Sequence, residues 1–340
     1  MNYKHYISKI TSFSHFLLLI LTAFVNFSCS SSAVTKNQSI DSEIAFTIPV
    51  DDFYPEGIAK DSKNNFYIGS LRYGTIYKAK IGDNKASEFI PANSGGLISV
   101  TGMIVDNKNN LWACSSDPGV SVYSKKDSVS LKKINLTNKK IEASYNLPKG
   151  GFCNDIAIDD KNNIYVTDSF NPRILILENG SSELKNFVTS AAFSGSGFNL
   201  NGITFDGKSS LFVVKYNSGK LFRISLADKS ITEINMIRPL FAADGLKAIS
   251  NGNLIVIEGG SVSDSALANG GSGRVTKIIV EKNNSAKLEI LKEGLDVPTT
   301  FAISGNEIFV IESQYDHLFK YKSIKHNPFI VRKFSIKDHL

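Results

Sequence analysis

The feature that most constrains this chain is a repeated pattern of two short apolar segments around a polar turn. The first copy reads Pro55-Glu-Gly-Ile-Ala-Lys-Asp-Ser-Lys-Asn-Asn-Phe-Tyr-Ile-Gly-Ser70. The pattern occurs six times, with turns that begin at Asp61, Asp106, Asp159, Asp206, Ser250 and Ser304. These turns are spaced 45, 53, 47, 44 and 54 residues apart, and a third apolar segment such as 220–224 follows most copies. Short strands that repeat at this spacing are typical of β-propeller blades.

Helical periodicity is missing from the repeat region, where no segment keeps apolar residues at a 3.6-residue spacing over about ten positions. We therefore predict an all-β fold: a six-bladed β-propeller with four antiparallel strands per blade over residues 43–340. A propeller must close so that its terminal blades leave no unpaired edge. Residues 44–50 and 329–335 are the two candidates for the closing strand. The N-terminal segment is favoured, which leaves 329–335 to add at the outer edge.

The turns at 61–65, 106–110 and 159–163 are rich in Asn and Asp. These residue types tolerate left-handed backbone and close hairpins, but they also occur in calcium loops. The EF-hand pattern of spaced acids that ends in Glu is absent. The sequence therefore predicts hairpin turns here.

Residues 1–28 have the composition of a secretory signal. Their apolar run at 16–25 is shorter than the about 20 residues that a transmembrane helix needs. Cys29 follows directly and resembles the lipidation site of a bacterial lipoprotein, with ordinary secretion and cleavage near Cys29 as the alternative. Residues 29–42 are polar, as in a flexible tether. We expect an exported protein that is anchored to a membrane of the bacterial cell envelope only through this lipid.

The excess of positive charge is small: the chain has 38 Lys+Arg and 32 Asp+Glu, which gives a formal net charge of +6. No Lys/Arg-rich stretch with interleaved aromatic residues occurs, so no nucleic-acid partner is expected. A monomer is expected.

Cys114 and Cys153 remain after the signal, and an exported protein can join them, but two cysteines do not make a disulfide framework. We predict that Cys114 and Cys153 are two separate thiols.

Equivalent positions in the six copies mark a place for chemistry. The first strand of each blade starts at one face of the central channel, so its first residues form a ring. The predicted ring consists of Glu56, Thr101, Asn154, Asn201, Asp244 and Thr299. Its carboxylates and amides suit a hard divalent cation, although Glu56 and Asp244 can also cap loops or lie at a hydrated rim. A glycine that allows close backbone approach follows the ring residue in four copies, at Gly57, Gly102, Gly202 and Gly245.

Four of these motifs carry a family resemblance. With Pro55-Glu56-Gly57, Asn154-Asp155, Asn201-Gly202 and Asp244-Gly245 in this order, residues 44–322 resemble the gluconolactonase / senescence marker protein (regucalcin-like) family. The resemblance implies a six-bladed propeller with one divalent cation in its channel, which hydrolyses sugar lactones or related esters. It implies Glu56, Asn201 and Asp244 as metal ligands, and Asn154 as a further ligand or a substrate-positioning amide. Calcium is the expected cation, with zinc, magnesium and manganese as alternatives.

Two ring residues are the predicted catalytic residues, Asp244 and Asn154. The resemblance implies that Asp244 orients or deprotonates the attacking water. A bound cation polarises a lactone carbonyl and eases deprotonation of water, while a carboxylate accepts the proton. Sugar-lactone members of the family often carry Arg where this sequence has Phe152. Together with Cys153 and Phe198, Phe152 predicts a more apolar entrance.

The second strand of each blade returns to the same face, so its end is expected to line the mouth of the channel. These positions hold Arg72, Asp117, Asp168, Lys215, Glu258 and Glu312. The predicted substrate-binding residues are Arg72, Phe152, Lys215, Glu258 and Glu312. The two cationic side chains suit an anionic or hydroxylated substrate, and solvated rim charges are the alternative. The insertion 259–272 is expected to be either a flexible lid or an idle surface loop.

We therefore predict a metal-dependent lactonase or esterase-type hydrolase that acts on a small molecule. A non-catalytic envelope propeller that binds a small ligand or a protein partner is the first rival. A metal-dependent phosphotriesterase-like hydrolase at the same site is the second.

Overall fold

A computed structural model describes residues 40–124, 129–259, 273–322 and 328–340. Its contacts form one compact unit, Ser39–Leu340. The predicted export signal, Cys29 and all of the predicted insertion except Gly259 lie outside the described residues. No described helix is both long and apolar enough to cross a membrane.

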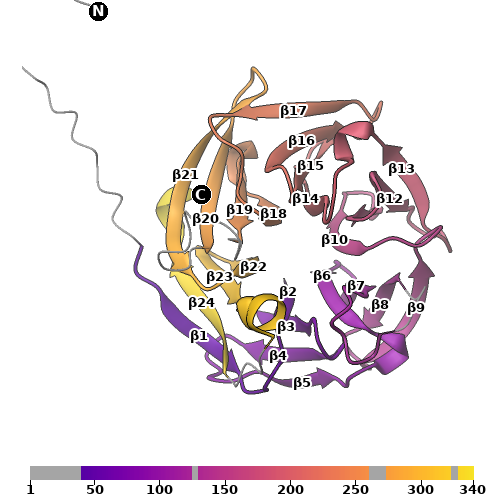
Figure 1. Cartoon of the computed structure of the whole chain (residues 1–340), viewed down its shortest axis with the longest axis vertical. Helices are drawn as coiled ribbons and strands as arrows, with labels where there is room; N and C mark the ends of the chain where they lie inside the picture. Colours follow the sequence, from indigo (N-terminus) through magenta and orange to yellow (C-terminus); the bar gives the residue numbers. More distant parts are fainter. Residues whose placement is uncertain (1–39, 125–128, 260–272, 323–327) are drawn as a thin grey trace, which may run out of the picture. The chain divides into compact units, whose positions relative to one another are not determined.

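The described residues form 24 β-strands, which confirms the all-β prediction (Figure 1). Three sheets contain four consecutive antiparallel strands each. The first sheet contains β2 (Pro55–Lys60), β3 (Asn65–Ser70), β4 (Ile76–Lys80) and β5 (Ser87–Ile90). The second contains β6 (Ser99–Val105), β7 (Asn110–Ser116), β8 (Ser130–Asn135) and β9 (Lys140–Asn146). The third contains β10 (Cys153–Ile158), β11 (Ile164–Asp168), β12 (Arg173–Leu177) and β13 (Lys185–Thr189).

The next eight strands form one sheet in the order β14-β15-β16-β17-β21-β20-β19-β18. Its first half contains β14 (Leu200–Phe205), β15 (Ser210–Lys215), β16 (Lys220–Ser225) and β17 (Ile231–Met236). Its second half contains β18 (Ala243–Ala248), β19 (Leu254–Glu258), β20 (Gly273–Val280) and β21 (Ser285–Leu295). The halves are joined by parallel pairing of β17 with β21 over only two residue pairs.

The last sheet joins both ends of the described chain, in the order β1-β24-β23-β22. Its strands are β22 (Pro298–Ser304), β23 (Glu307–Glu312), β24 (Phe329–Ser335) and β1 (Glu43–Ile48). The N-terminal strand thus completes the last sheet, the closing role that the sequence predicts for it. The expectation that 329–335 adds outside it is wrong, because β24 pairs on one side with β23 and on the other with β1.

The strands β2, β6, β10, β14, β18 and β22 lie nearest the centre of the unit (Figure 1). Each contacts the first strand of the two neighbouring groups, and β22 contacts β2, so the inner strands form a closed ring. Short helical turns complete the described structure: Ser94–Gly96, Ala191–Phe193, Ser250–Gly252, the π-helical turn Asp316–Tyr321, and Lys337–His339.

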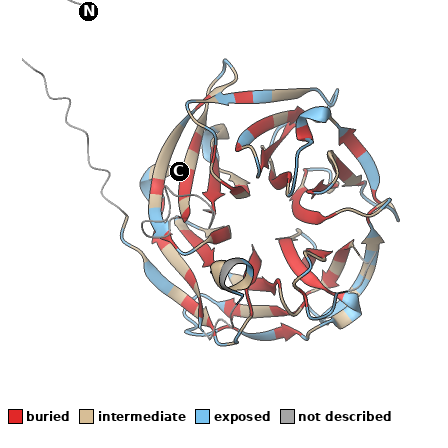
Figure 2. Cartoon of the chain, in the orientation of Figure 1, coloured by how far each residue is buried: buried red, intermediate tan, exposed pale blue. Residues whose placement is uncertain are grey.

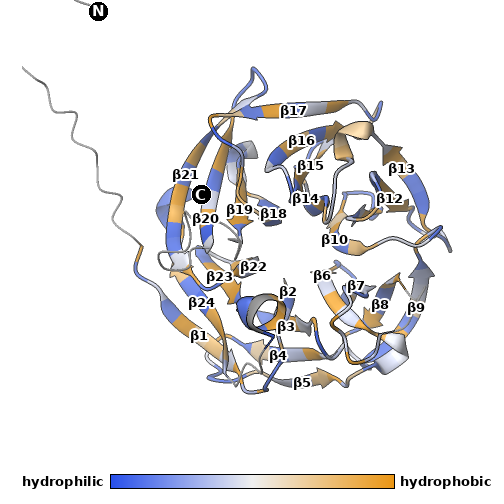
Figure 3. Cartoon of the chain, viewed as in Figure 1, coloured by the Kyte–Doolittle hydropathy of each residue, from blue (hydrophilic) through white to orange (hydrophobic). Residues whose placement is uncertain are grey.

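The core lies between neighbouring sheets, as the buried strand segments in Figure 2 and the apolar ones in Figure 3 show. In the space between the first and last sheets, the rings of Phe66 and Phe309 pack 4.4 Å apart. Second strands such as β7 are buried along their whole length, whereas the outer strand β9 is not. This explains why second strands are the most continuously apolar segments: both of their faces meet another sheet.

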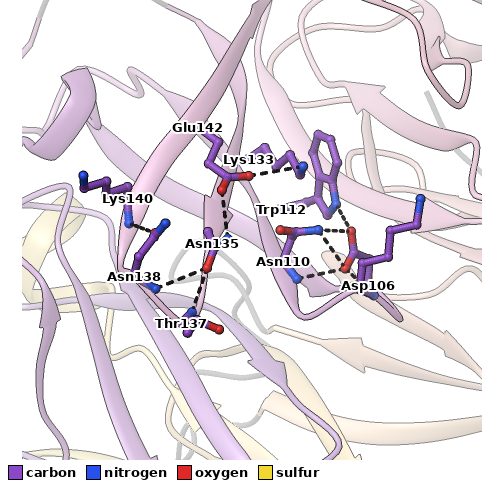
Figure 4. Close-up of polar contacts among 10 residues, drawn as sticks. Asp106, Asn110, Trp112, Lys133, Asn135, Thr137, Asn138, Lys140 and Glu142 are labelled. Atoms are coloured by element: carbon purple, nitrogen blue, oxygen red, sulfur yellow. Dashed lines mark hydrogen bonds and ion pairs between the residues drawn. The ribbon is translucent and has the colours of Figure 1, made fainter.

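The Asp-rich turns are hairpins, as predicted, and Asp106 illustrates how they are held (Figure 4). Its carboxylate accepts hydrogen bonds from the backbone amides of Lys108 and Asn110, and from Trp112 Nε1 at 2.9 Å. Asn109 provides the left-handed backbone that the turn requires, with φ of 63°. Asp61 and Asp159 make the corresponding contacts in their own turns. Since protein donors use these carboxylates, the calcium-loop alternative is not needed.

Cys114 of β7 and Cys153 of β10 form a disulfide, with their Cα atoms 5.2 Å apart. The preference for two separate thiols is therefore wrong. Sequence spacing hides the pairing because the residues stand 39 positions apart in neighbouring sheets. Both side chains lie fully buried in the same apolar cluster.

Candidate functional site

A β-bulge stands near the start of all six inner strands. In β2, Pro55 pairs with Ser70 and the next aligned pair is Ile58 with Ile68, so one extra residue is accommodated. The same shift occurs in the other inner strands β6, β10, β14, β18 and β22. Bulges bend a strand and re-aim its side chains. In each copy the bulge includes the predicted ring residue.

All six predicted ring residues line one cavity of about 290 Å³ at this end of the inner strands. Its lining residues are Glu56, Leu71, Thr101, Pro118, Phe152, Asn154, Phe198, Asn201, Tyr216, Asp244, Gly259, Val297, Pro298, Thr299, Tyr315 and Phe319. The repeat spacing therefore assembles the predicted set correctly in space.

Two glycines show why the inner strands can approach so closely here. A Cβ atom on Gly57 would lie 1.9 Å from the carbonyl oxygen of Thr101, and one on Gly202 would lie 2.2 Å from that of Asp244. Both distances are far below van der Waals contact. Each glycine lets its strand pack against the next ring residue, which confirms the predicted close approach.

Hydroxyl and amide groups fix parts of the ring. Thr101 Oγ1 donates to the carbonyl oxygen of Cys153 at 2.9 Å, which links β6 to β10. Asn154 Nδ2 donates to Ser169 Oγ at 2.8 Å. This bond uses the amide nitrogen of Asn154 and leaves its amide oxygen to accept or to coordinate.

Glu56 and Asp244 are the carboxylates of the cavity, and neither is in an ion pair within the described part of the chain. Burial raises the pKa of Glu56 well above its usual range, and the negative charges of Asp244 and then Asp155 raise it further. Burial and the charge of Asp155 likewise raise the pKa of Asp244, against a hydrogen bond with Asn201 that lowers it. The site thus brings together acidic groups that form no ion pair with a described cation.

This donor set fits a hard divalent cation. Two carboxylates, close enough for the charge of Asp244 to raise the proton affinity of Glu56, line the same cavity as two amides and supply the oxygen ligands that calcium and magnesium prefer. No group of three His, Cys, Asp or Glu side chains able to hold a metal occurs among the described residues. A cation here would therefore need the Asn oxygens, backbone or water in addition to the two carboxylates.

Two tyrosines that the sequence reasoning missed also line the cavity, Tyr216 and Tyr315. The hydroxyl of Tyr315 is buried and has no partner in good hydrogen-bond geometry among the described residues. Burial and then the charges of Glu56 and Asp244 raise its pKa, so the phenol keeps its proton at neutral pH. Burial and the charge of Asp244 raise the pKa of Tyr216 to about 12. Both phenols face the carboxylates as neutral groups.

Of the predicted substrate-binding residues, only Phe152 lines the cavity. Lys215 Nζ donates to the carbonyl oxygens of Ala192 and Ser194. Arg72 donates to the carbonyl oxygen of Val120. Since both cationic groups are held by backbone oxygens away from the cavity lining, the structure does not support their predicted contact with substrate.

The two acidic residues predicted to bind substrate, Glu258 and Glu312, are held in ion pairs. Glu258 is fully buried and accepts from Arg238 at 2.7 and 2.8 Å and from Arg274 at 3.1 Å. Glu312 accepts from Arg332 Nε at 2.7 Å. Neither carboxylate lines the cavity, so we do not propose either as a substrate contact.

The other predicted mouth acids also serve the scaffold. Asp168 accepts from Arg173 and from the backbone amide of Phe152, which holds that residue in place. Asp117 accepts from the backbone amide of Gly119.

At several predicted positions the next residue in the sequence, before or after, lines the cavity instead. These residues are Leu71, Pro118, Tyr216 and Gly259. Successive side chains of an extended strand point to opposite faces. The sequence signal that could have found Tyr216 is thus its place directly after the buried strand β15.

No model of a known protein family matches this sequence, and no curated protein matches it. Solved structures do resemble it. Virginiamycin B lyase from Staphylococcus aureus shares 16% identity with a TM-score of 0.57, over 86% of this chain and 98% of that chain. A protein of unknown function from Bacteroides thetaiotaomicron shares 12% identity with a TM-score of 0.61, over 86% and 75%.

A third similar structure is the major Malassezia sympodialis allergen Mala s 1, with 15% identity and a TM-score of 0.61 over 86% of this chain and 96% of that chain. At such identities the likeness shows the fold alone. Together with the closed ring of inner strands, it supports the predicted β-propeller. The resemblance to the gluconolactonase family stays a prediction.

Proposed function

We propose that this protein is a hydrolase of a lactone or related ester that uses a divalent cation, calcium in the first instance. The observation that carries the proposal is a pair of carboxylates in one cavity, buried Glu56 and half-buried Asp244, which form no ion pair with a described residue. Buried charges need a partner, since desolvation makes isolated ones costly. Glu56, Asn201, Asp244 and Asn154 would hold the cation.

A cation held there would polarise a substrate carbonyl and make water easier to deprotonate. The residues of the chain have separate tasks around it. Asp244 accepts the proton of the attacking water, for which its raised proton affinity is suited. Asn154, fixed by Ser169, holds the cation with its amide oxygen or donates its second Nδ2 hydrogen to the substrate. Tyr315 offers a neutral hydroxyl to a developing oxyanion.

The proposal includes an architecture and a place in the cell. The four four-stranded sheets and the two halves of the eight-stranded sheet correspond to six blades closed by β1. We propose that residues 1–28 direct export and that Cys29 carries the lipid anchor of an envelope protein. The Cys114–Cys153 disulfide supports export, because disulfides persist in oxidising compartments.

The experiment is a cation and activity titration of the purified protein. Bound metal is determined, and hydrolysis of lactones and aryl esters is followed with and without chelator. Wild type is compared with Asp244→Asn, and with Asp206→Asn as a matched control in a hairpin turn outside the cavity. We expect chelator-sensitive activity that Asp244→Asn lowers by about 10²-fold or more and that Asp206→Asn retains.

The rival functions are outcomes of the same titration. A protein that binds no divalent ion and turns over no ester is a binding module, and the proposal is then wrong. Turnover of phosphotriesters in preference to lactones would assign the site to the phosphotriesterase-like rival. Full activity in Asp244→Asn would overturn the residue assignment.

A lyase reaction is a second candidate, since the similar structures include virginiamycin B lyase. An elimination at this site would use Asp244 to remove a proton from carbon instead of from water. Hydrolysis in water enriched in ¹⁸O places the isotope in the acid product, whereas elimination leaves the product unlabelled. Mass spectrometry of the products therefore separates the two reactions.

A further inference from the structure

The residues that line the cavity fall into a polar set and a largely apolar set. The polar set is the carboxylate, amide and threonine side chains of the ring. The largely apolar set consists of Leu71, Pro118, Phe152, Phe198, Tyr216, Val297, Pro298, Tyr315 and Phe319. No Lys, Arg or His is among the described residues that line the cavity. Apart from the hydroxyls of Tyr216 and Tyr315, the largely apolar set offers no hydrogen-bonding side chain, and it offers no cationic group to an anion.

A cluster of aromatic rings lies at the cavity. Phe152, Phe170 and Phe198 contact one another, with ring centroids 5.0 to 5.1 Å apart. Phe198 also contacts Tyr216 at 6.5 Å. These rings come from loops next to β10, β11, β14 and β15, and all of them except that of Phe170 line the cavity.

A second aromatic pair lines the cavity from another part of the chain. Tyr315 and Phe319 pack edge to face, with centroids 5.6 Å apart, at the π-helical turn that follows β23. Phe319 is 46% exposed, and Phe170, next to Phe198 and Phe152, is 50% exposed. Two large aromatic side chains half in water beside one cavity would lose that exposure if an apolar ligand covered them.

We propose that the cavity takes a neutral, hydrophobic lactone or ester with a ring-bearing substituent, which lies against Phe152, Phe198 and Phe319 while its carbonyl reaches Asn154 and Asp244. The placement of the ligand's carbonyl at Asn154 and Asp244 rests on the proposed function. The volume of about 290 Å³ limits the ligand to a small one. A polyhydroxylated sugar lactone is expected to bind less well, because any hydroxyls that lie against the aromatic side chains would be desolvated without partners.

The test compares three lactones in calcium buffer: γ-butyrolactone, γ-phenyl-γ-butyrolactone and D-glucono-δ-lactone. Their binding to the purified protein is measured by calorimetry, and their turnover is measured separately. We expect the phenyl compound to bind at least about tenfold more tightly than γ-butyrolactone, which corresponds to about 1.4 kcal/mol. Phe198→Ser and Phe319→Ser should each remove most of this increment.

Tyr145→Ser is the matched control, since Tyr145 is a partly exposed aromatic residue on the outer strand β9, away from this cavity. Phe319 is half exposed, so its replacement keeps the test open even if Phe198→Ser does not fold. Equal affinities for the phenyl and unsubstituted lactones, or tighter binding of gluconolactone, would overturn the inference.

The binding and turnover results separate this inference from the proposed function. If the phenyl compound binds more tightly than γ-butyrolactone, and this gain depends on Phe198 and Phe319, the hydrophobic ligand class is supported. If no lactone is turned over in the same experiment, the hydrolase is contradicted. Turnover of gluconolactone without a phenyl increment supports the hydrolase and contradicts the ligand class.

Discussion

The hydroxyl of Thr299 donates a hydrogen bond to the carbonyl oxygen of Glu56 at 2.9 Å, across 243 residues of sequence. The bond joins β22 to β2, the last and first of the inner strands. It therefore closes the ring of inner strands at the residue whose side chain enters the cavity. Stability and site geometry depend on the same contact.

The first prediction concerns this closing bond. Thr299→Val keeps the shape of the side chain but leaves the buried carbonyl of Glu56 without this donor, which typically costs about 1–3 kcal/mol. We expect the free energy of unfolding to fall by this amount in denaturant titrations. Thr47→Val is the control, because Thr47 donates to Asn84 at 3.3 Å on an exposed edge. Equal losses in the two variants would contradict the importance of the closing bond.

The second prediction concerns cation removal. Calcium at about 100 times its dissociation constant should stabilise the wild-type protein by about 2.7 kcal/mol, seen as a rise in Tm that chelator reverses. Asp244→Asn should lose this gain. Without calcium at pH 8 the variant should be more stable than wild type, because the repulsion that raises the pKa of Glu56 is relieved. A wild-type Tm that calcium does not change would count against the cation site.

The third prediction is a pH dependence of stability. Burial alone would raise the pKa of Glu258, but hydrogen bonds from Arg238, Thr276 and the Phe241 amide lower it below its ordinary value. A lowered folded-state pKa stabilises the protein above the unfolded value of about 4.3. That stability is lost as the pH falls through the folded-state pKa.

The measurement for Glu258 is urea unfolding of wild type and Glu258→Gln between pH 7 and pH 3. The difference between the two proteins should be largest at neutral pH and shrink on acidification. A difference that stays constant over this range would show that the ion pairs with Arg238 and Arg274 add no pH-dependent stability.

The fourth prediction concerns the disulfide between Cys114 and Cys153. The two cysteines stand 39 positions apart. In the chain-entropy treatment, closing such a loop in the unfolded chain raises the free energy of unfolding by about 4 kcal/mol, and measured values are typically about 2–4 kcal/mol. Reduction, or replacement of both cysteines by serine, should lower the free energy of unfolding by that amount. Cys153 stands between the cavity residues Phe152 and Asn154, so calcium affinity is measured alongside stability. Unchanged stability after verified reduction would contradict this.

The repeat pattern predicts the inner strands and the ring because equivalent residues of a repeat occupy equivalent places. Glu56, Asn154 and Asp244 are far apart in the sequence, yet their shared register brings them to one cavity. Their turns could be predicted for the same reason, as the matching contacts of Asp61 and Asp106 show.

The entrance could not be predicted in the same way, because a shift of one residue along a strand moves a side chain to the other face. Lys215 and Tyr216 are neighbours, but the first is held by backbone carbonyls and the second lines the cavity. Tyr315 belongs to a loop outside the repeat pattern. The pairing of Cys114 with Cys153 depends on two sheets that only the folded chain brings together.

The pairing of β1 with β24 has a consequence for the order of folding. The segment that leaves the proposed tether first has its partner at residues 329–335, nearly the whole chain away. Contacts between such distant segments slow folding, since the intervening chain must be ordered first. Until then β1 is an unpaired edge that other chains can capture. Completion of the last sheet is thus expected to be the final and most aggregation-sensitive stage of folding.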